Sequence, residues 1–369
     1  MKIVYFTHSL SSCWNHGNAH FLRGVLRELI RLDHQVEVFE PADPWSLRNL
    51  LADHGPAGLE PFHLTYPDLR SRSSPRGFDP AEVVDGADLV IVHEWNDPEL
   101  VAAVGRARAQ GGNFTLLFHD THHRAASDPD SIRSLDLTAY DGVLAFGASL
   151  AEVYSGWGWG RRAFVWHEAA DVTVFHPPAE EVSRAGLVWI GNWGDGERTA
   201  ELEEFLLRPA AAAGLPLDIH GVRYPPAALD LLARHGAQFR GWLPNASAPG
   251  AFADHMATIH VPRRFYAEAL AGIPTIRVFE ALACGIPLIC APWPDSEGLF
   301  RPGRDYLTAA DGAEMEGSLR ALKDDPGLRR ELAASGLDTV LARHTCAHRA
   351  AELLAIAEGL AQSQLARAG

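Results

Sequence analysis

The sequence predicts an α/β protein made of two doubly wound domains, each with a parallel sheet covered by helices. Three observations predict this fold class. Apolar runs of strand length alternate with helical segments along the whole chain, which is typical of parallel sheets with right-handed crossovers. A segment rich in proline and charge, residues 171–185, interrupts the alternation near the middle. The length of 369 residues and a hydrophobic content of 47% provide for two substantial cores.

The first half alternates strands and helices. Expected strands are short runs of apolar or alternating residues, at 2–7, 35–40, 87–93, 113–119 and 142–146. Residues 18–31 are expected to form a helix because apolar side chains recur there with helical spacing, at Phe21, Leu22, Val25, Leu26, Leu29 and Ile30. Segment 53–80 is rich in Pro, Gly, Ser and Arg, so we expect an irregular surface insertion.

The second half repeats the pattern, with strands expected at 187–190, 217–220, 258–261 and 286–290. Before the last of them, Gly272 and Pro274 break the chain, Thr275 is expected to cap a helix, and Gly285 is expected to end it. The tail at 346–367 has helical character. The expected division is a first domain over 1–177, a second over 178–345, and a C-terminal helix over 346–369.

Composition excludes several classes of partner. The formal net charge of −15 argues against nucleic acid and against docking on an anionic membrane. No apolar run approaches the roughly 18 residues that a transmembrane helix needs. The first residues read as a strand rather than a signal peptide, and four scattered cysteines fit a reduced, cytoplasmic setting. No spacing indicates a metal site.

Residues 272–292 carry the most informative pattern. A helix N-terminus after a glycine turn attracts anions, because free N–H groups and the helix dipole both point at it. Arg277 falls in the first turn of this helix, where a positive charge is unfavourable for the helix dipole and a bound anion would rationalise it. Glu280 follows one turn on, where its carboxylate could accept hydrogen bonds from a sugar diol. The pattern therefore indicates a nucleotide-sugar site. An ordinary helix-to-strand unit with a solvated Glu280 is the alternative.

Two loops of the first domain are further candidates, since ligands bind outside the carboxyl ends of strands in doubly wound domains. The loop at 9–18 lacks a GxGxxG pattern, and His16 in it could bind an acceptor or a neighbouring loop atom. The second loop follows the strand at 113–119. Asp120 is the only acid among its histidines, so it is the candidate general base, and His122 is a candidate acceptor ligand. The spacing of His119 and His122 is not that of a helical zinc site.

The segment Arg277-Val-Phe-Glu-Ala-Leu-Ala-Cys-Gly-Ile-Pro resembles the donor-site motif of GT-B glycosyltransferases. It is most similar to the CgeB-like (spore-maturation type) group, allied to the retaining sucrose, glycogen and mannosyl transferases. The resemblance implies two Rossmann-like domains facing each other across a cleft. It also implies a nucleoside diphosphate sugar as donor, a hydroxyl-bearing acceptor (saccharide, protein or small molecule), and neither metal nor other cofactor.

The resemblance also implies roles for particular residues. Gly17 would approach the donor phosphates or sugar, and His119, the second catalytic candidate, would contact the sugar. Thr275, Ile276, Arg277 and Glu280 would bind the donor. The family carries an arginine and a lysine on the diphosphate where this chain has Asn192 and Arg198, so one cation is missing. Arg263 and Arg264 are alternative phosphate ligands. The allied family's second glutamate is replaced by Gly272, and Asp295 or Glu297 nearby either faces the cleft or forms a turn.

Two other functions remain open. One is a GT-B nucleotide-sugar epimerase or a phosphorolytic enzyme, and the other is a degenerate, non-catalytic nucleotide-sugar-binding subunit. The sequence indicates neither the sugar, nor the base, nor the anomeric outcome.

Overall fold

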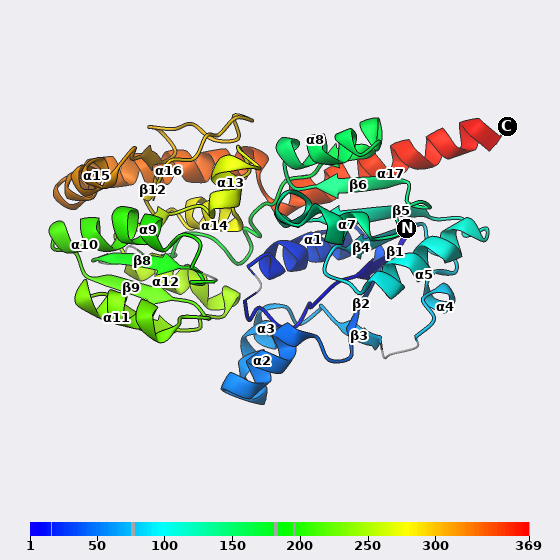
Figure 1. Ribbon diagram of the computed structural model, residues 1–369, viewed down its shortest axis with the longest axis horizontal. Coiled ribbons are helices and arrows are strands. Elements are labelled where there is room, and N and C mark those ends of the chain that lie inside the picture. The colour runs from blue at the N-terminus through cyan, green and yellow to red at the C-terminus, as the bar shows by residue number, and fades with distance from the viewer. Residues whose placement is uncertain (16, 75–77, 181–183, 195, 369) are drawn as a thin grey trace. The chain divides into compact units, whose positions relative to one another are not determined.

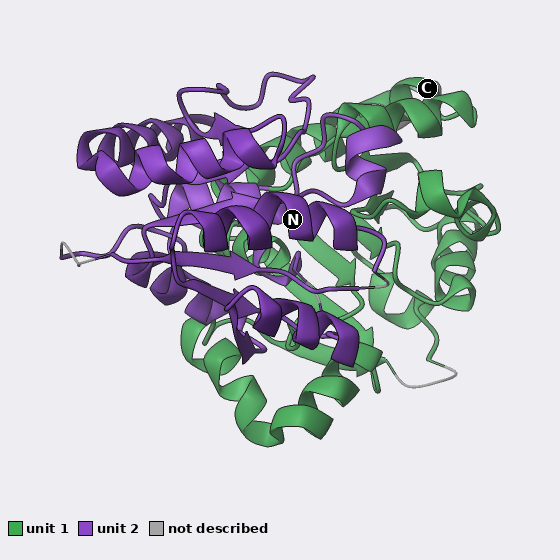
Figure 2. Cartoon of the chain, turned by 60° about the vertical axis from the view of Figure 1, so that its left-hand side comes forward, with its two compact units in different colours: residues 1–13, 21–168, 346–369 green, residues 14–20, 169–345 purple. Residues whose placement is uncertain are grey.

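The computed structural model describes residues 1–15, 17–74, 78–180, 184–194 and 196–368, and Figure 1 traces their helices and strands. The chain divides into two compact units (Figure 2). Unit 1 comprises Met1–Cys13, Phe21–Glu168 and Cys346–Gly369, and unit 2 comprises Trp14–His20 and Ala169–Thr345. The main break therefore lies before Ala169 rather than after Pro177, and a short segment of the first half, Trp14–His20, clusters with unit 2.

Unit 1 is built on a seven-stranded parallel sheet in the order β3-β2-β1-β4-β5-β6-β7. Its strands are β1 (Lys2–Phe6), β2 (Gln35–Pro41), β3 (Ser71–Ser74), β4 (Leu89–His93), β5 (Thr115–Asp120), β6 (Gly142–Ala145) and β7 (Ala163–Val165). The inner strands β1, β4, β5 and β6 are buried along most of their length, which is why they read as apolar runs. All five strands expected in this half are confirmed.

Helices flank this sheet (Figure 1). They are α1 (Ala19–Arg31), α2 (Trp45–His54), α3 (Glu60–Thr65), α4 (Ala81–Val84), α5 (Pro98–Ala109), α6 (Arg124–Ser127), α7 (Pro129–Arg133), α8 (Ala148–Gly156) and α17 (Cys346–Ala368). The apolar stripe of α1 is buried at Phe21, Leu22, Val25, Leu26 and Leu29. Trp166 connects the tail helix to the rest of unit 1, because its indole N–H donates to the Arg349 carbonyl at 2.9 Å.

The expectation of an irregular insertion over 53–80 is wrong. The segment includes the end of α2, a 3-10 turn at Pro56–Leu59, the helix α3 and the strand β3. The strand escaped notice because its sequence is Ser-Arg-Ser-Ser. Among the strands that the structure describes, it lies at the edge of the sheet and pairs only with β2, so its side chains need not be apolar.

Unit 2 contains a six-stranded parallel sheet in the order β10-β9-β8-β11-β12-β13. Its strands are β8 (Leu187–Ile190), β9 (Leu217–His220), β10 (Gln238–Gly241), β11 (Ala257–His260), β12 (Leu288–Cys290) and β13 (Leu307–Thr308). The four strands expected here are confirmed, with bounds shifted by up to two residues. Apolar side chains of neighbouring strands, such as Leu187, Ile219, Ile259 and Ile289, belong to one buried cluster.

The helices of unit 2 are α9 (Thr199–Leu202), α10 (Arg208–Ala212), α11 (Pro226–Arg234), α12 (Ala248–Asp254), α13 (Arg264–Glu268), α14 (Ile276–Ala283), α15 (Gly312–Asp324) and α16 (Pro326–Arg343). A π-helical turn at Glu203–Leu207 joins α9 to α10. Gly285 follows α14 with φ +60°, and the N–H of Ile286 donates to the Ala281 carbonyl at 3.3 Å. Gly285 therefore ends α14 through a left-handed cap, as expected.

Candidate functional site

The sheet of unit 2 has a topological switch point between β8 and β11. From this pair the strand order runs outward to β9 and β10 on one side and to β12 and β13 on the other. In open α/β sheets, ligands bind outside the carboxyl ends of the strands at such a point. The carboxyl end of β8 leads into Gly191 and Asn192, and β11 ends at His260. The residues expected to bind the donor should therefore gather at this edge.

The helix α14 begins beside the end of β11. Thr275 occupies the N-cap position, but its side chain makes no capping hydrogen bond, so that expectation is wrong. Its hydroxyl lies 3.2 Å from Nε2 of His260 instead. Burial, followed by the nearby Arg198, lowers the pKa of His260 to about 3, so the imidazole is neutral at physiological pH. The contact ties the start of α14 to the switch point.

Glu280 is held from two sides at the second turn of α14. Its side chain has no exposed surface. One oxygen, Oε2, accepts a hydrogen bond from Nη1 of Arg277, and the other, Oε1, lies 2.7 Å from Nδ1 of His20. Burial by itself would raise the pKa of Glu280, but Arg277 and His20 outweigh it and lower the pKa below its ordinary value. Glu280 is therefore an ionised, buried carboxylate, which excludes the alternative of a solvated acid.

The segment Trp14–His20 brings the glycine loop to α14 within unit 2. A Cβ added to Gly17 would lie 3.4 Å from Cγ2 of Ile276 and 4.0 Å from Nη2 of Arg277. The loop is also tied to the end of β8. Nδ2 of Asn192 donates to Oδ1 of Asn15, and Oδ1 of Asn192 accepts from the Val222 N–H at 2.9 Å. Gly17, Ile276, Arg277 and Asn192 thus gather at one edge, whereas His16 falls outside the described residues.

Arg198 bridges the ends of the two switch-point strands. Nη1 donates to the Val261 carbonyl at 2.7 Å, Nη2 donates to the Asn192 carbonyl at 2.9 Å, and the guanidinium lies 5.3 Å from the Trp189 ring centroid. The side chain is only partly exposed. In this conformation Arg198 braces the loop after β8. Its positive charge still lies at the edge where a diphosphate is expected.

The alternative phosphate ligands are already paired with acids. Nε of Arg263 lies 2.8 Å from a Glu197 oxygen, and Nη2 of Arg264 lies 2.9 Å from a Glu201 oxygen. These pairs hold the start of α13 to the segment at the start of α9. Arg277 differs from both because its partner, Glu280, is itself a predicted ligand.

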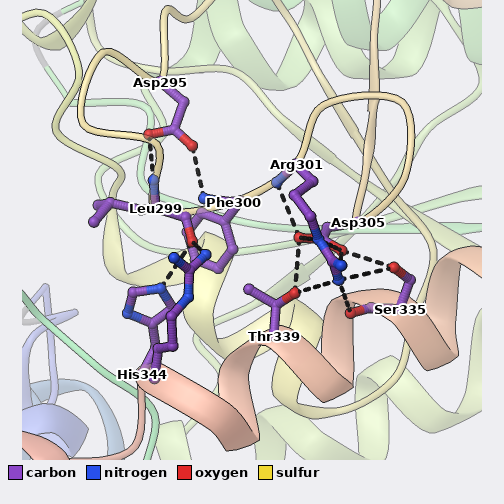
Figure 3. Close-up of polar contacts among 9 residues, drawn as sticks. Asp295, Leu299, Phe300, Arg301, Asp305, Ser335, Thr339 and His344 are labelled. Atoms are coloured by element: carbon purple, nitrogen blue, oxygen red, sulfur yellow. Dashed lines mark hydrogen bonds and ion pairs between the residues drawn. The ribbon is translucent and has the colours of Figure 1, made fainter.

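In the loop after β12, the carboxylates of Asp295 and Asp305 accept hydrogen bonds from the loop itself and from neighbouring residues (Figure 3). Asp295 accepts from the N–H groups of Leu299 and Phe300 at 3.0 and 2.7 Å. Asp305 accepts hydrogen bonds from Arg301 and from hydroxyls of α16, which are Ser335 Oγ at 2.8 Å and Thr339 Oγ1 at 2.9 Å. Of the two expectations for Asp295, the turn-forming role is the one that the geometry supports.

The backbone conformation at Gly272 and its close approach to Ser296 disfavour a glutamate at this position. Its φ is +93°, a conformation that favours glycine, and an added Cβ would come within 1.9 Å of Oγ of Ser296. A larger residue therefore requires both a different backbone conformation and a displaced Ser296.

In unit 1, the predicted catalytic pair is buried at the end of β5. His119 is 2% exposed, its Nδ1 lies 2.5 Å from the Tyr5 hydroxyl, and its ring packs edge-on against Trp166 at 4.8 Å. Desolvation lowers the pKa of His119 to about 3. Asp120 accepts from the Tyr154 hydroxyl at 2.7 Å and from the His122 N–H at 3.0 Å. His122 is partly buried, and its ring packs on His123 with 4.0 Å between centroids.

The sequence reasoning missed Glu94, a second buried carboxylate in unit 1. It follows β4, the strand next to β5, and its side chain has no exposed surface. Arg124 donates to both its carboxylate and, at 2.6 Å, its carbonyl. Burial raises the pKa of both Glu94 and Asp120, and the charge of Asp120 raises that of Glu94 further. Glu94 could have been selected from the sequence because it is an acid directly after an expected buried strand, which is also the position of Asp120.

Among the described residues, no group of three or more His, Cys, Asp and Glu side chains is arranged to hold a metal ion. Nor does the described part of the chain contain a helix both long and apolar enough to cross a membrane. All four cysteines are free.

Several solved structures share this architecture. Anabaena HepE in complex with UDP and glucose aligns over 99% of this chain and 100% of its own, at 13% identity and a TM-score of 0.66. Sucrose-phosphate synthase from Thermosynechococcus elongatus aligns over 100% of both chains, at 16% identity and a TM-score of 0.65. T4 phage BGT, in complex with its UDP-glucose substrate, aligns over 98% of this chain and 99% of its own, at 12% identity and a TM-score of 0.60. The chain has the GT-B glycosyltransferase fold.

The GT-B fold agrees with a match in sequence over the second half. Residues 198–355 match the family described as "Glycosyl transferase-like". The matched segment includes Arg198 and all of α14, so it contains most of the predicted donor ligands of the GT-B protein. No curated protein matches the chain in sequence.

Proposed function

We propose that the protein transfers a sugar from a nucleoside diphosphate sugar to a hydroxyl-bearing acceptor. The observation that carries this proposal is the arrangement around α14. A glycine loop, a helix N-terminus, an arginine and a buried ionised carboxylate meet at the switch point of the unit 2 sheet. These groups match the two polar parts of a nucleotide, the diphosphate and the ribose. The Glycosyl transferase-like match of residues 198–355 supports the same reading.

In this proposal, unit 2 binds the donor. The first-turn amides of α14, at Thr275 and Ile276, and the guanidinium of Arg277 hold the diphosphate, with Arg198 and Asn192 shaping the opposite loop. Glu280 accepts hydrogen bonds from the ribose hydroxyls. Positive groups fixed at the diphosphate stabilise the charge that develops as it leaves, so we propose catalysis without a metal ion or other cofactor. The neighbours crystallised with UDP or UDP-glucose make uridine the first base to test.

We propose that unit 1 supplies the acceptor side, with Asp120 as general base, His119 against the sugar, and His16 and His122 as acceptor ligands. Asp120 has no exposed surface in this conformation. Proton transfer to it therefore requires the turn at His122 to move when the acceptor binds. Asp120 keeps acceptor capacity for this step, because a carboxylate has about four lone-pair sites and the described bonds use two.

We propose that the protein belongs to the CgeB-like group, because the segment from Arg277 to Pro287 resembles that group, and that transfer retains the anomeric configuration. A cytoplasmic setting fits the four free cysteines. The acceptor, whether saccharide, protein or small molecule, is to be found by screening once the donor is known.

A thermal-shift screen followed by product analysis tests this function. UDP, GDP, ADP and TDP, each also as sugar conjugates, would be added in the presence of EDTA. A nucleotide at 100 times its Kd adds about 2.7 kcal/mol to the free energy of unfolding, so one nucleotide should raise Tm by several degrees. The matching sugar nucleotide should then be consumed with release of the nucleoside diphosphate. No shift with any nucleotide contradicts the proposal.

Product analysis separates the two other functions. The replacement of a family cation by Asn192, together with the use of Arg198 by backbone carbonyls, favours a non-catalytic subunit as the second candidate. Such a subunit would bind the sugar nucleotide and leave it unchanged. An epimerase would convert the sugar nucleotide without any acceptor, and it would form no glycosylated acceptor.

A further inference from the structure

His20 contacts the predicted ribose ligand, although no pattern in the sequence singled it out. It is the second residue of α1 and lies in the Trp14–His20 segment that clusters with unit 2. Its Nδ1 is 2.7 Å from Oε1 of Glu280, and neither side chain has any exposed surface. The Phe175 ring covers the imidazole, with 4.2 Å between the ring centroids. His20 is therefore enclosed against Glu280.

The two partners of Glu280 differ in how firmly they are held. The Arg277 side chain is 26% exposed and lies three residues from Glu280 on the same helix. A guanidinium on a long side chain can leave one acceptor for another at little packing cost. His20 is fully buried under Phe175 and has no comparable freedom. Of the two, Arg277 is the partner that can move when a ligand arrives.

We propose that His20 is a positioning residue for ribose recognition. It fixes Oε1 of Glu280, so that Oε2 is presented to the ribose of a nucleoside diphosphate as Arg277 moves from Glu280 to the diphosphate. This inference rests on the proposed function. The nucleotide supplies both replacements, because its diphosphate attracts the guanidinium and its hydroxyls donate to the carboxylate oxygen that Arg277 leaves.

The exchange requires a second, stationary partner for Glu280. A buried carboxylate left without any partner is costly, and it would then favour the protonated form. The imidazole, whose Nδ1 lies 2.7 Å from Oε1, stays beside Glu280 throughout, and the ribose adds hydrogen-bond donors at Oε2. Both the charge and the orientation of the carboxylate are thereby maintained while Arg277 is engaged elsewhere.

The test compares UDP with 2′,3′-dideoxy-UDP by isothermal titration calorimetry. The wild type should prefer UDP by tenfold or more, because hydrogen bonds to an ionised carboxylate are strong. H20L should reduce this preference toward unity. H20N should retain most of it, because its amide nitrogen can take the place of Nδ1. Sugar transfer by H20L should show a raised KM with a smaller change in kcat.

Two controls keep this test decisive. H255L removes a histidine of the same unit that lies 3.6 Å from Asp218, and it should leave the preference unchanged. R277A should weaken UDP binding far more than uridine binding yet keep the ribose preference. This partly exposed site can be changed even if H20L fails to fold. Loss of the preference in R277A, or its retention in folded H20L, overturns the inference. Failure of wild-type protein to bind any nucleotide overturns the proposed function instead.

Discussion

Glu280 and Asp120 are fully buried carboxylates, and each is held by partners from distant parts of the sequence. Glu280 is paired with His20, 260 positions earlier, and Asp120 accepts from Tyr154 on α8. Both acids could be selected from the sequence because each stands in or beside an apolar element. Their partners could not be selected, because such contacts depend on how the chain folds rather than on spacing. The residue types indicated which chemistry each site could perform, whereas tertiary packing determines which partners hold each carboxylate.

The hydroxyl of Tyr154 should set the pH dependence of sugar transfer. Burial raises the pKa of Asp120 to about 6, while the hydrogen bond from Tyr154 stabilises the ionised form and opposes that rise. A general base must be ionised, so the rate should fall as the pH drops through this value. Y154F removes the donor, and the acid limb of the kcat/KM profile should move to higher pH by about one unit.

Y140F is the matched control for that prediction. Tyr140 is similarly buried, but its hydroxyl donates to the Val101 carbonyl at 3.0 Å rather than to a carboxylate. Its profile should superimpose on that of the wild type. An acid limb that stays in place in Y154F, or moves equally in Y140F, would exclude Asp120 as the base.

At the scale of elements, burial separates the strands that the sequence predicted from those that it did not. In the described part of the chain, all nine inner strands of the two sheets were expected, and all four edge strands, β3, β7, β10 and β13, were missed. An inner parallel strand is covered on both faces and reads as an apolar run. An edge strand has no such requirement, as the Ser-Arg-Ser-Ser of β3 and the mostly exposed Gln-Phe-Arg-Gly of β10 show.

The turn before α14 should tolerate no side chain at Gly272. G272A places a Cβ in a left-handed conformation and 1.9 Å from Oγ of Ser296. G236A is the matched control, because Gly236 also has a positive φ, of +72°, but has nothing within 4 Å of an added Cβ. Both variants should lose stability through backbone strain, and G272A should lose about 1–3 kcal/mol more through overpacking.

Thermal unfolding measures that difference, and a second substitution identifies its cause. S296A removes the clashing hydroxyl, so the double variant G272A/S296A should recover part of the loss in Tm. Equal losses in G272A and G236A would show that Ser296 does not restrict this position. The glycine would then reflect backbone conformation alone.

At the scale of the whole molecule, the compact units do not follow the order of the chain. Unit 2 incorporates the early segment Trp14–His20, and unit 1 incorporates the last helix, α17. The sequence predicted two parallel α/β sheets. It could not predict that the glycine loop clusters with unit 2, because that assignment rests on long-range contacts with Asn192 and α14. This placement is what completes the proposed donor site with Gly17 and His20.

Calorimetric titration of a nucleoside diphosphate into wild type and E280Q tests the central claim most directly. The account predicts metal-free binding of one nucleotide by the wild type. It also predicts at least a tenfold weaker affinity in E280Q, because the amide loses the charge that attracts the ribose hydroxyls. E316Q, which changes a partly exposed glutamate paired with Arg320 on α15, should bind as the wild type does. Equal affinity in E280Q and the wild type, or no binding of any nucleotide, would contradict the account.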